Sequence, residues 1–527
     1  MDDRALLSAY AKARAAGSAG AAGTAAEGYA AALALSPDNE VLAARALSQA
    51  MAAGDQALAL RAARILEKKG MVAPDARLLL LGEALRTKDW RSADRHIAQI
   101  QKDEVFAFMT PVLRAWVAHG TKKGDPLAII AAAKADPLAG GYSAEHRPLL
   151  LLAQGRKEGV PELLQLSEGP SGRATRLRIA GAATIAKRDR AAATALLQGD
   201  APPLVAARQL LESGKAIPGG VSTAAAGVAE LLVRIALDLH AQRIGQLALT
   251  YARLATFLAP ENSETWLVTS ELLAGQDQQQ EAIRVLANIR PEDPFASSAA
   301  DARIRLLVLS GNKDAALAEA EAATRAPGAG VANWSRLGDI FTELKRHEDA
   351  ARAYGQALDA LKQGGTGQAE WALWLLRGGA LEQADKWPEA RAALQQAYKL
   401  APDQPLVLNY LGYAQLERRE NIEEAMSLIV KASTLQPDNH AITDSLGWAH
   451  YLRGNLRSAI ELLEKAAAGE PADPAINEHL GDAYYSAGRR FEARYAWRAA
   501  LLHAEEADAS RIRAKIDAGL TPKLAAP

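Results

Sequence analysis

Apolar and small residues recur in the last third of the chain with a period of 34 to 35 residues. Leu-Gly pairs mark this period, since Leu411 and Leu446 are 35 residues apart and Leu446 and Leu480 are 34 apart. Each pair is followed by an Ala-rich stretch with helical spacing, and the first two units then reach a proline, Pro437 or Pro471. Because proline cannot continue a helix beyond its first turn, each period predicts two helices that end at a proline.

The same pattern defines five units in the C-terminal part of the chain, beginning near residues 331, 371, 405, 440 and 474. Within a unit, a large residue occupies the fourth position, and small residues occupy the eighth, twentieth and twenty-seventh. Small residues such as Gly447, Ala459 and Ala466 allow the two helices of a pair to approach closely. A pair of this size cannot bury its own apolar face, so we expect successive pairs to stack.

Weaker versions of the pattern occur upstream, at residues 229–260, 263–291 and 296–327 and before residue 104. Residues 105–226 keep the apolar periodicity of helices but lose the repeat signature. Clusters of Gly and Pro interrupt the repeat pattern there: Gly140-Gly141, Gly169-Pro170-Ser171-Gly172, Pro202-Pro203 and Pro218-Gly219-Gly220. We therefore predict N-terminal repeats at 1–104, divergent helical hairpins at 105–226, and a C-terminal array with a terminal capping helix at 227–527.

Three C-terminal segments resemble a known repeat family: NYLGYAQLERRENIEEAMSLIVKAS, DNHAITDSLGWAHYLRGNLRSAIELLEKA and INEHLGDAYYSAGRRFEARYAWRAAL. They are similar to bacterial tetratricopeptide-repeat (TPR) proteins of the exported, lipoprotein-like proteobacterial class. The resemblance implies an all-α fold, a right-handed superhelical solenoid of antiparallel helix pairs. Some relatives are adaptors that hold a periplasmic C-terminal processing protease together with its cell-wall hydrolase substrates. This chain departs from the lipid-anchored relatives because it has no cysteine.

Composition agrees with packed helices and narrows the chemistry. Charged residues make up 23% of the chain and aromatic residues 5%, and the formal net charge is −1. This charge favours neither nucleic acid nor an acidic membrane as a partner. No stretch approaches 18 consecutive apolar residues, so we expect no membrane-spanning segment. The absence of cysteine excludes disulfides, Cys-ligated zinc and a lipid anchor on cysteine in this chain.

The first residues, MDDRALL, are acidic where a secretory signal peptide has a basic segment followed by an apolar one. Two interpretations follow: a cytoplasmic protein, or a mature exported protein whose leader was replaced by Met1. We keep both and favour the periplasm.

No arrangement of residues predicts catalysis. The nine histidines are dispersed, and no two have the His-Glu-x-x-His spacing of a helical zinc site. His440, His450 and His479 lie in neighbouring units and could converge, but ordinary surface or inter-helix positions account for them better. The sequence contains neither a phosphate-binding glycine loop nor a nucleophile elbow. We expect no enzyme activity, no metal and no cofactor.

The second, fifth, ninth and twelfth positions of each first helix are expected to line the concave groove of the array. Tyrosine and tryptophan there offer a rigid apolar face with a polar tip, as residues at protein interfaces do. The predicted groove contains no Lys or Arg and should prefer neutral or basic segments. The alternative for Trp448 and Tyr451 is packing between repeats. The predicted partner-binding residues are Asn409, Tyr413, Asp444, Trp448, Tyr451, Glu478, Asp482 and Tyr485.

A basic segment near the C-terminal end contains interleaved aromatic residues, a combination that occurs in nucleic-acid-binding proteins. Its members are Arg489, Arg490, Phe491, Arg494, Tyr495, Trp497 and Arg498, followed by Arg511, Arg513 and Lys515. Acidic neighbours dilute this charge, and a last helix normally carries a polar capping face. We therefore expect a solvated cap and no nucleic acid.

Together these features predict a non-catalytic scaffold or adaptor that binds partner proteins or peptides in its grooves. The resemblance extends this prediction to the recruitment of envelope proteases or cell-wall enzymes. The alternative is a structural or assembly component that self-associates, as a homo-oligomer, or bridges envelope complexes.

Overall fold

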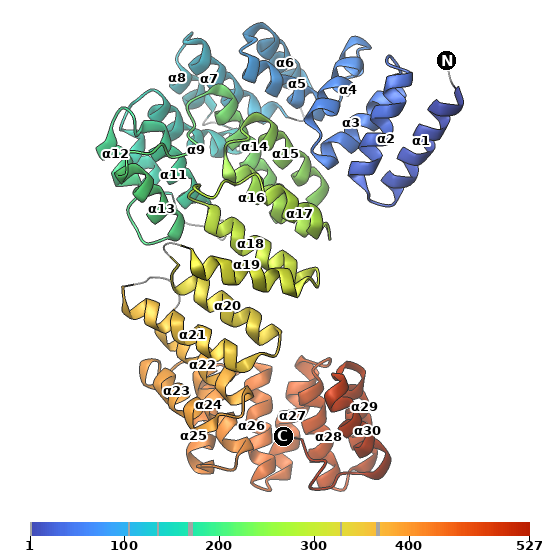
Figure 1. Cartoon of the computed structure of the whole chain (residues 1–527), viewed down its shortest axis with the longest axis vertical. Coiled ribbons are helices and arrows are strands. Elements are labelled where there is room, and N and C mark those ends of the chain that lie inside the picture. Colours follow the sequence, from blue (N-terminus) through green and yellow to red (C-terminus); the bar gives the residue numbers. More distant parts are fainter. Residues whose placement is uncertain are drawn as a thin grey trace. The chain divides into compact units, whose positions relative to one another are not determined.

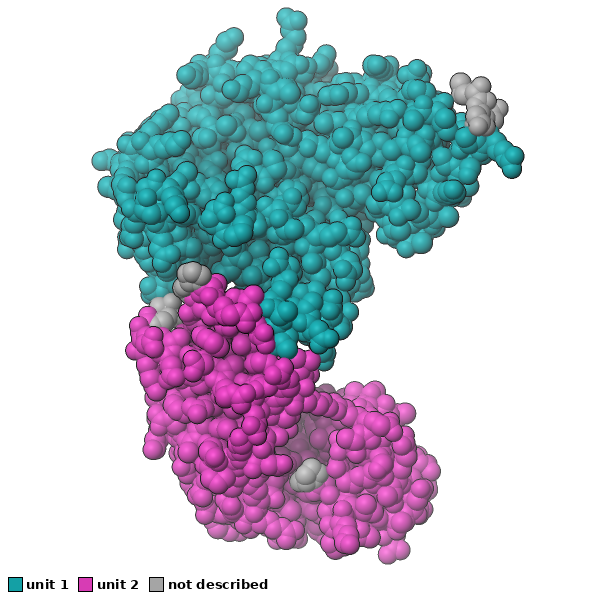
Figure 2. All heavy atoms as spheres, in the orientation of Figure 1, with its two compact units in different colours: residues 1–319 teal, residues 320–527 magenta. Residues whose placement is uncertain are grey.

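The computed structural model describes residues 3–103, 106–133, 136–166, 172–326, 329–364 and 369–526. The described residues form helices, turns and loops without any β-strand, so the predicted all-α class is confirmed. The chain divides into two compact units, Met1–Glu319 and Ala320–Pro527 (Figures 1 and 2). Both boundaries predicted from the sequence, at 104/105 and 226/227, fall inside the N-terminal unit. Most of the predicted break at Gly169–Gly172 lies outside the described residues.

The helices of the N-terminal unit are mostly consecutive antiparallel neighbours (Figure 1). They are α1 (Asp3–Ser18), α2 (Ala22–Leu35), α3 (Glu40–Ala53), α4 (Gln56–Lys68), α5 (Pro74–Thr87), α6 (Trp90–Lys102), the 3-10 helix η1 (Ala107–Met109), α7 (Thr110–Thr121), α8 (Pro126–Ala132), α9 (Pro137–Ala153), α10 (Gly159–Leu164), α11 (Arg173–Ile185), α12 (Arg190–Leu196), α13 (Pro202–Glu212), α14 (Ala224–Ala241), α15 (Gly245–Leu258), α16 (Ser263–Ala274), α17 (Gln279–Leu286), α18 (Ala296–Leu309) and α19 (Lys313–Arg325), which continues into the second unit.

The Gly and Pro clusters of this region take different places relative to the helices. Gly140 and Gly141 lie within α9, and Pro202 and Pro203 open α13. Proline is compatible with the first turn of a helix because the N–H groups there have no intrahelical partner.

The helix pair α14–α15 packs at the centre of the N-terminal unit. Besides its chain neighbours, α14 contacts α5, α7 and α9, and α15 contacts α3 and α5. The residues from Ala224 to Ala236 are all buried except Arg234, which is half-buried. A helix that is apolar on all sides must be buried on all sides. This unit therefore departs from a simple linear stack, in which each pair would contact only its neighbours in the chain.

A glycine permits the close approach of α14 to α7. A Cβ atom added to Gly227 would lie 2.0 Å from Cε2 of Trp116. The indole of Trp116 is completely buried, and its Nε1 donates a hydrogen bond to Nδ1 of His146 on α9 at 3.1 Å. No other residue type fits at position 227 without displacement of this ring.

The C-terminal unit is a stack of helix pairs in chain order, and each pair packs on the next. The predicted unit starts agree with the observed first helices within one residue. The helices are α20 (Val331–Glu343), α21 (His347–Lys362), α22 (Glu370–Gln383), α23 (Trp387–Leu400), α24 (Pro405–Glu417), α25 (Ile422–Leu435), α26 (His440–Leu452), α27 (Leu456–Gly469), α28 (Pro474–Ser486), α29 (Arg490–His503) and α30 (Glu506–Ala518), which covers α29 at the end of the stack.

Glycine at the eighth position of the first helix marks the closest approach within a pair. A Cβ atom at Gly447 would lie 2.8 Å from Leu463, and one at Gly481 would lie 2.3 Å from Trp497. Ala459 and Ala466 of α27 are completely buried. The role predicted for the small residues of the repeat is thus confirmed, and the unit has the architecture of a TPR array.

Candidate functional site

The eight predicted groove residues lie on α24, α26 and α28, the first helices of three successive pairs. Helix α26 packs against both α24 and α28. We call their shared surface the first-helix face and define it by these eight residues. Its members divide into a half-buried set, which is Asn409, Tyr413, Tyr451 and Tyr485, and a buried set, which is Asp444, Trp448, Glu478 and Asp482.

Trp448 lies in the packing between α26 and α28, as in the alternative that the sequence left open. Its ring is 1% exposed and stacks on Tyr451 and on His479, with centroid distances of 4.5 and 4.2 Å. The indole Nε1 has no hydrogen-bond partner among the described residues. Trp448 therefore fills the interface between two repeats, and Tyr451 is the more accessible member of the stack.

A buried ion pair joins the same two helices. Nδ1 of His479 lies 3.0 Å from both carboxylate oxygens of Asp444. Burial alone would lower the pKa of His479, but the charge and hydrogen bond of Asp444 outweigh it, so this pKa is raised. Asp444 is therefore compensated within the chain. His479 was one of three histidines for which the sequence favoured an ordinary surface or inter-helix position over convergence. It lies on α28, between two helices, one residue after Glu478.

Side chains of the capping helix α30 bind the other two acidic residues, Glu478 and Asp482. Nζ of Lys515 is completely buried and lies 2.6 Å from Glu478 Oε1 and 2.8 Å from both carboxylate oxygens of Asp482. Arg511 binds the Glu478 carboxylate through two hydrogen bonds of 2.9 and 2.8 Å. Burial would raise the pKa of Glu478, but these donors outweigh it, so the pKa is lowered.

The segment that follows the capping helix α30 also contacts α28, at Asp482 and Tyr485. The backbone N–H of Ala526 donates to Asp482 Oδ2 at 2.8 Å. Gly519 lies so close to Tyr485 that an added Cβ atom would be 2.3 Å from the tyrosine hydroxyl. The α28 end of the first-helix face is therefore neutralised and partly covered by the chain itself. The physical basis for expecting an acidic groove that prefers basic segments is absent at this end.

The α24 and α26 part of the face keeps unused hydrogen-bonding capacity. Oδ1 of Asn409 and Nε1 of Trp448 are buried and have no partner among the described residues. Such groups cost about 1–3 kcal/mol each when left unsatisfied, and each needs an explanation in a bound water, an ion or a ligand. Tyr413 and Tyr451 lie half-buried on the same two helices.

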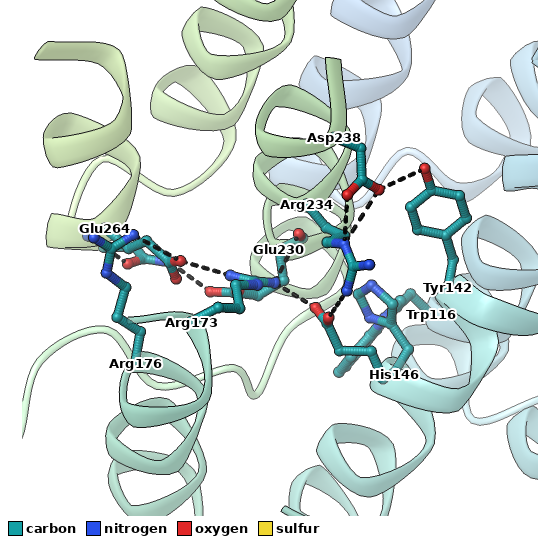
Figure 3. A network of polar contacts seen from close by, with 11 residues as sticks. Trp116, Tyr142, His146, Arg173, Arg176, Glu230, Arg234, Asp238 and Glu264 are labelled. Carbon is teal, nitrogen blue, oxygen red and sulfur yellow. Dashed lines mark hydrogen bonds and ion pairs between the residues drawn. The ribbon is translucent and has the colours of Figure 1, made fainter. Parts of the chain in front are cut away.

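The N-terminal unit holds a second polar centre, which sequence analysis did not predict. Arg173, the first residue of α11, donates to Glu145 on α9 at 2.5 Å, to Glu230 on α14 at 2.9 Å and to Glu264 on α16 at 2.7 Å (Figure 3). All four side chains are buried. One guanidinium thus joins three helices to the start of α11.

Further contacts extend this centre, which we call the Arg173 network. Asn262 donates to Glu230 at 2.7 Å, Arg234 to Glu145 at 2.8 Å, and Tyr142 to Asp238 at 2.9 Å. Figure 3 shows the carboxylates turned toward the arginines Arg173, Arg176 and Arg234, with Trp116 and His146 at one side. Every carboxylate in the network has a cationic or hydrogen-bonding partner. The arrangement is that of a structural junction.

Glu230 and His146 are expected to act in opposite directions on the pH dependence of stability. Burial and then Glu264 raise the pKa of Glu230 from 4.5 to about 7, and burial lowers that of His146 from 6.5 to about 4. The contribution of Glu230 is present below pH 4.5 and is lost as pH rises through about 7. The contribution of neutral His146 is present above pH 6.5 and is lost as pH falls toward about 4. Between these limits the two contributions oppose each other.

Glu230→Gln should therefore uncover the pH dependence due to His146. The free energy of unfolding of the variant minus that of the unchanged chain should increase with pH between about pH 4.5 and 6.5, by up to about 1.4 kcal/mol per pH unit. Urea denaturation at each pH measures this slope. Glu261→Gln, at an exposed position, is the matched control. Equal slopes for Glu230→Gln and the unchanged chain would contradict the prediction.

The described residues contain no group of three or more His, Asp or Glu side chains placed to hold a metal ion. Within the same residues, no helix has both the length and the apolar character that crossing a membrane requires. The expectations of no catalysis, no cofactor and no nucleic acid stay predictions.

No protein-family profile matches the sequence, and comparison with curated proteins gives no match. Solved structures with a similar fold include the APC/C hetero-tetramer Cut9–Hcn1, at 17% identity and a TM-score of 0.39 over 97% of this chain and 95% of that one. A TPR protein from Parabacteroides merdae has 14% identity and a TM-score of 0.41, over 50% of this chain and 98% of that one. A thermophilic TPR protein from Thermus thermophilus has 21% identity and a TM-score of 0.31, over 36% and 98%.

Because these TM-scores are below 0.5, the fold assignment depends on the chain's own helix pairs and glycine contacts. They define an all-α helix-pair repeat protein of the TPR type.

Proposed function

We propose that this protein is a non-catalytic interaction scaffold whose first-helix face holds a segment of a partner protein. The α24 and α26 part of that face is the binding region. Its half-buried tyrosines, Tyr413 and Tyr451, provide apolar contact area with polar tips. The α28 part, covered by Lys515 and the segment up to Ala526, forms the closed end.

The unused polar atoms of the first-helix face carry this proposal. Oδ1 of Asn409 can accept a hydrogen bond, and Nε1 of Trp448 can donate one, and the described chain satisfies neither. A peptide backbone offers one N–H and one C=O per residue, which is the complementary pair. Both atoms are closed to solvent in the free chain, so a partner segment lying across α24 and α26 would bond to them only after the side chains turn outward, a smaller change for the half-buried Asn409 than for Trp448.

In its finer form, we propose that the scaffold recruits an envelope protease or a cell-wall enzyme. The support for this form is the sequence resemblance of the C-terminal repeats. Recovery of a peptidase or a cell-wall hydrolase as the stoichiometric partner would support it.

Asn409→Ala is expected to weaken partner binding about tenfold, the effect of roughly one lost hydrogen bond. The fold should keep its stability, because the Asn409 side chain makes no hydrogen bond among the described residues. The matched control is Asn455→Ala, an exposed position at the start of α27 with no side-chain capping bond. Co-purification with the tagged full chain identifies the partner, and calorimetric titration gives its affinity for each variant.

Light scattering of the purified chain tests the alternative role. A stable homo-oligomer that Asn409→Ala dissociates would favour a self-associating structural component instead of an adaptor. A stoichiometric partner that binds both variants and the unchanged chain equally would place the binding surface elsewhere and overturn the proposal.

A further inference from the structure

The outer side of α29 exposes large apolar residues that the fold does not use. Phe491 is 71% exposed, Tyr495 56% and Leu502 80%. Phe491 and Tyr495 are the two aromatic side chains among the exposed large hydrophobic residues of the described chain, and their rings contact edge to face at 4.9 Å. Trp497, the third aromatic residue of this segment, is instead completely buried against α28. The basic and aromatic residues noted in the sequence therefore separate into a core residue and an exposed pair.

Two arginines lie on the same side of the helix. Arg494 and Arg498 are exposed and fall between the apolar positions at helical spacing. Neither forms an ion pair or hydrogen bond in the described part of the chain, whereas the nearby Arg489 and Arg511 are bound to carboxylates. We call these five residues the α29 stripe: Phe491, Arg494, Tyr495, Arg498 and Leu502. It covers about 16 Å, three turns of one helix.

A capping face that only contacts water would carry polar residues. Three of the five residues of the α29 stripe are large and apolar, so solvation does not explain its composition. Phenylalanine, tyrosine and arginine are the residue types that contribute most to protein interfaces. Exposed apolar groups gathered on one face mark interaction sites, whereas isolated ones do not. Figure 1 shows α29 beside α30 in the last layer of the C-terminal unit.

The charges of the stripe identify its occupant. A second copy of this chain would bring two pairs of uncompensated arginines against each other, which opposes self-association. Glu505 and Glu506, which follow the stripe in the chain, are paired with Lys345 and Arg513 and so do not compensate its arginines. The stripe is a single helix face of three turns, which matches one amphipathic helix better than a flat anionic surface such as a membrane or a nucleic acid.

We propose that the α29 stripe docks an acidic amphipathic helix of a partner protein. Carboxylates of this helix pair with Arg494 and Arg498, and its apolar residues pack on Phe491, Tyr495 and Leu502. The site lies on a second helix of the stack and is independent of the binding proposed for the first-helix face. A scaffold with both sites holds two partners at once.

Two synthetic helical peptides test the proposal against the full chain. Both peptides carry leucine at positions 1, 5 and 12, which share one helical face. At positions 4 and 8 of the same face, one peptide carries glutamate and the other lysine. Fluorescence anisotropy should show saturable binding of the glutamate peptide at micromolar concentrations and none of the lysine peptide. Phe491→Ser with Tyr495→Ser should weaken binding at least tenfold. Leu309→Ser, at an equally exposed apolar position of α18 (73%), should not.

Charge reversal gives the sharper result. Arg494→Glu with Arg498→Glu should make the chain prefer the lysine peptide, and both substitutions lie at exposed positions that do not support the fold. Failure of the glutamate peptide to bind, or equal binding of both peptides, would overturn the proposal. So would dimerisation, or binding of anionic vesicles or duplex DNA, that Phe491→Ser abolishes.

Discussion

Arg173→Met is expected to destabilise the N-terminal unit by about 3–5 kcal/mol at neutral pH, one of the two largest effects we predict for a single substitution. The substitution keeps most of the volume but removes the cation that, among the described residues, contacts Glu145, Glu230 and Glu264 together. Glu145 keeps Arg234, at 2.8 Å, and Glu264 keeps Arg176, at 3.5 Å, whereas Glu230 is left with the amide of Asn262. A buried carboxylate that loses its cation costs more than the ion pair itself contributes. The effect should appear first in α9, α14 and α16, where hydrogen exchange of the backbone amides should increase.

Chemical denaturation followed by circular dichroism measures the loss, and two comparisons test its cause. Arg176→Met should cost much less, because the ion pairs of Arg176 within the described residues are limited to Glu264, at 3.5 Å. Arg173→Met should also cost less in a Glu230→Gln background, since one buried carboxylate has then been removed. A loss of less than about 1 kcal/mol on Arg173→Met would mean that water compensates the carboxylates and that the network is not dry.

The C-terminal unit was predictable from sequence because each repeat contains the residues that determine how its own two helices pack. Gly447 and Gly481 stand where only a missing side chain allows two helices to meet, and the spacing between them is the period of the stack. The information is local, so a single sequence contains it. In the N-terminal unit, by contrast, α14 packs on α5, α7 and α9, which precede it by many residues. No period in the sequence encodes contacts of this kind.

The Arg173 network escaped prediction for the same reason. Its three carboxylates come from α9, α14 and α16, far apart in the chain. One local signal was present, since Glu230 is the single charged residue in the apolar stretch from Ala224 to Val233. A lone charge in a helix that is otherwise apolar must be paired or neutral when buried. That argument identifies Glu230 as a buried partner but not Arg173 as its cation.

The predicted groove residues lie on the first helices of three pairs, but the burial of four of them was not predictable. The position of a residue in the repeat indicates on which side of a helix it lies. It does not indicate which side chains of other helices pack on that residue. Asp482 has the register of a groove residue, yet Lys515 and the segment ending at Ala526 cover it. Those contacts join residues more than 30 positions apart and depend on how the capping helix folds back on the stack.

Trp448→Ala is expected to destabilise the C-terminal unit by about 3–5 kcal/mol, the range for truncation of a buried aromatic side chain. From sequence alone, an exposed Trp448 would be expected to leave folding almost unchanged when truncated. The structure leads to the opposite expectation, because the ring is 1% exposed and stacks on both Tyr451 and His479. Denaturation of the variant should show α26 and α28 unfolding at lower denaturant than the rest of the stack, as repeat arrays lose cooperativity when one interface fails.

Trp448→Phe separates the packing role of this residue from a binding role. Phenylalanine keeps an aromatic ring between Tyr451 and His479, and it removes the five-membered ring of the indole together with the Nε1–H group, which the described chain leaves without a partner. The free energy of unfolding should therefore fall much less than in Trp448→Ala, by the cost of the smaller ring. If a partner accepts a hydrogen bond from Nε1, its affinity should fall about tenfold with Trp448→Phe while the fold persists. Unchanged affinity would restrict Trp448 to inter-repeat packing and leave Asn409 as the polar contact of the first-helix face.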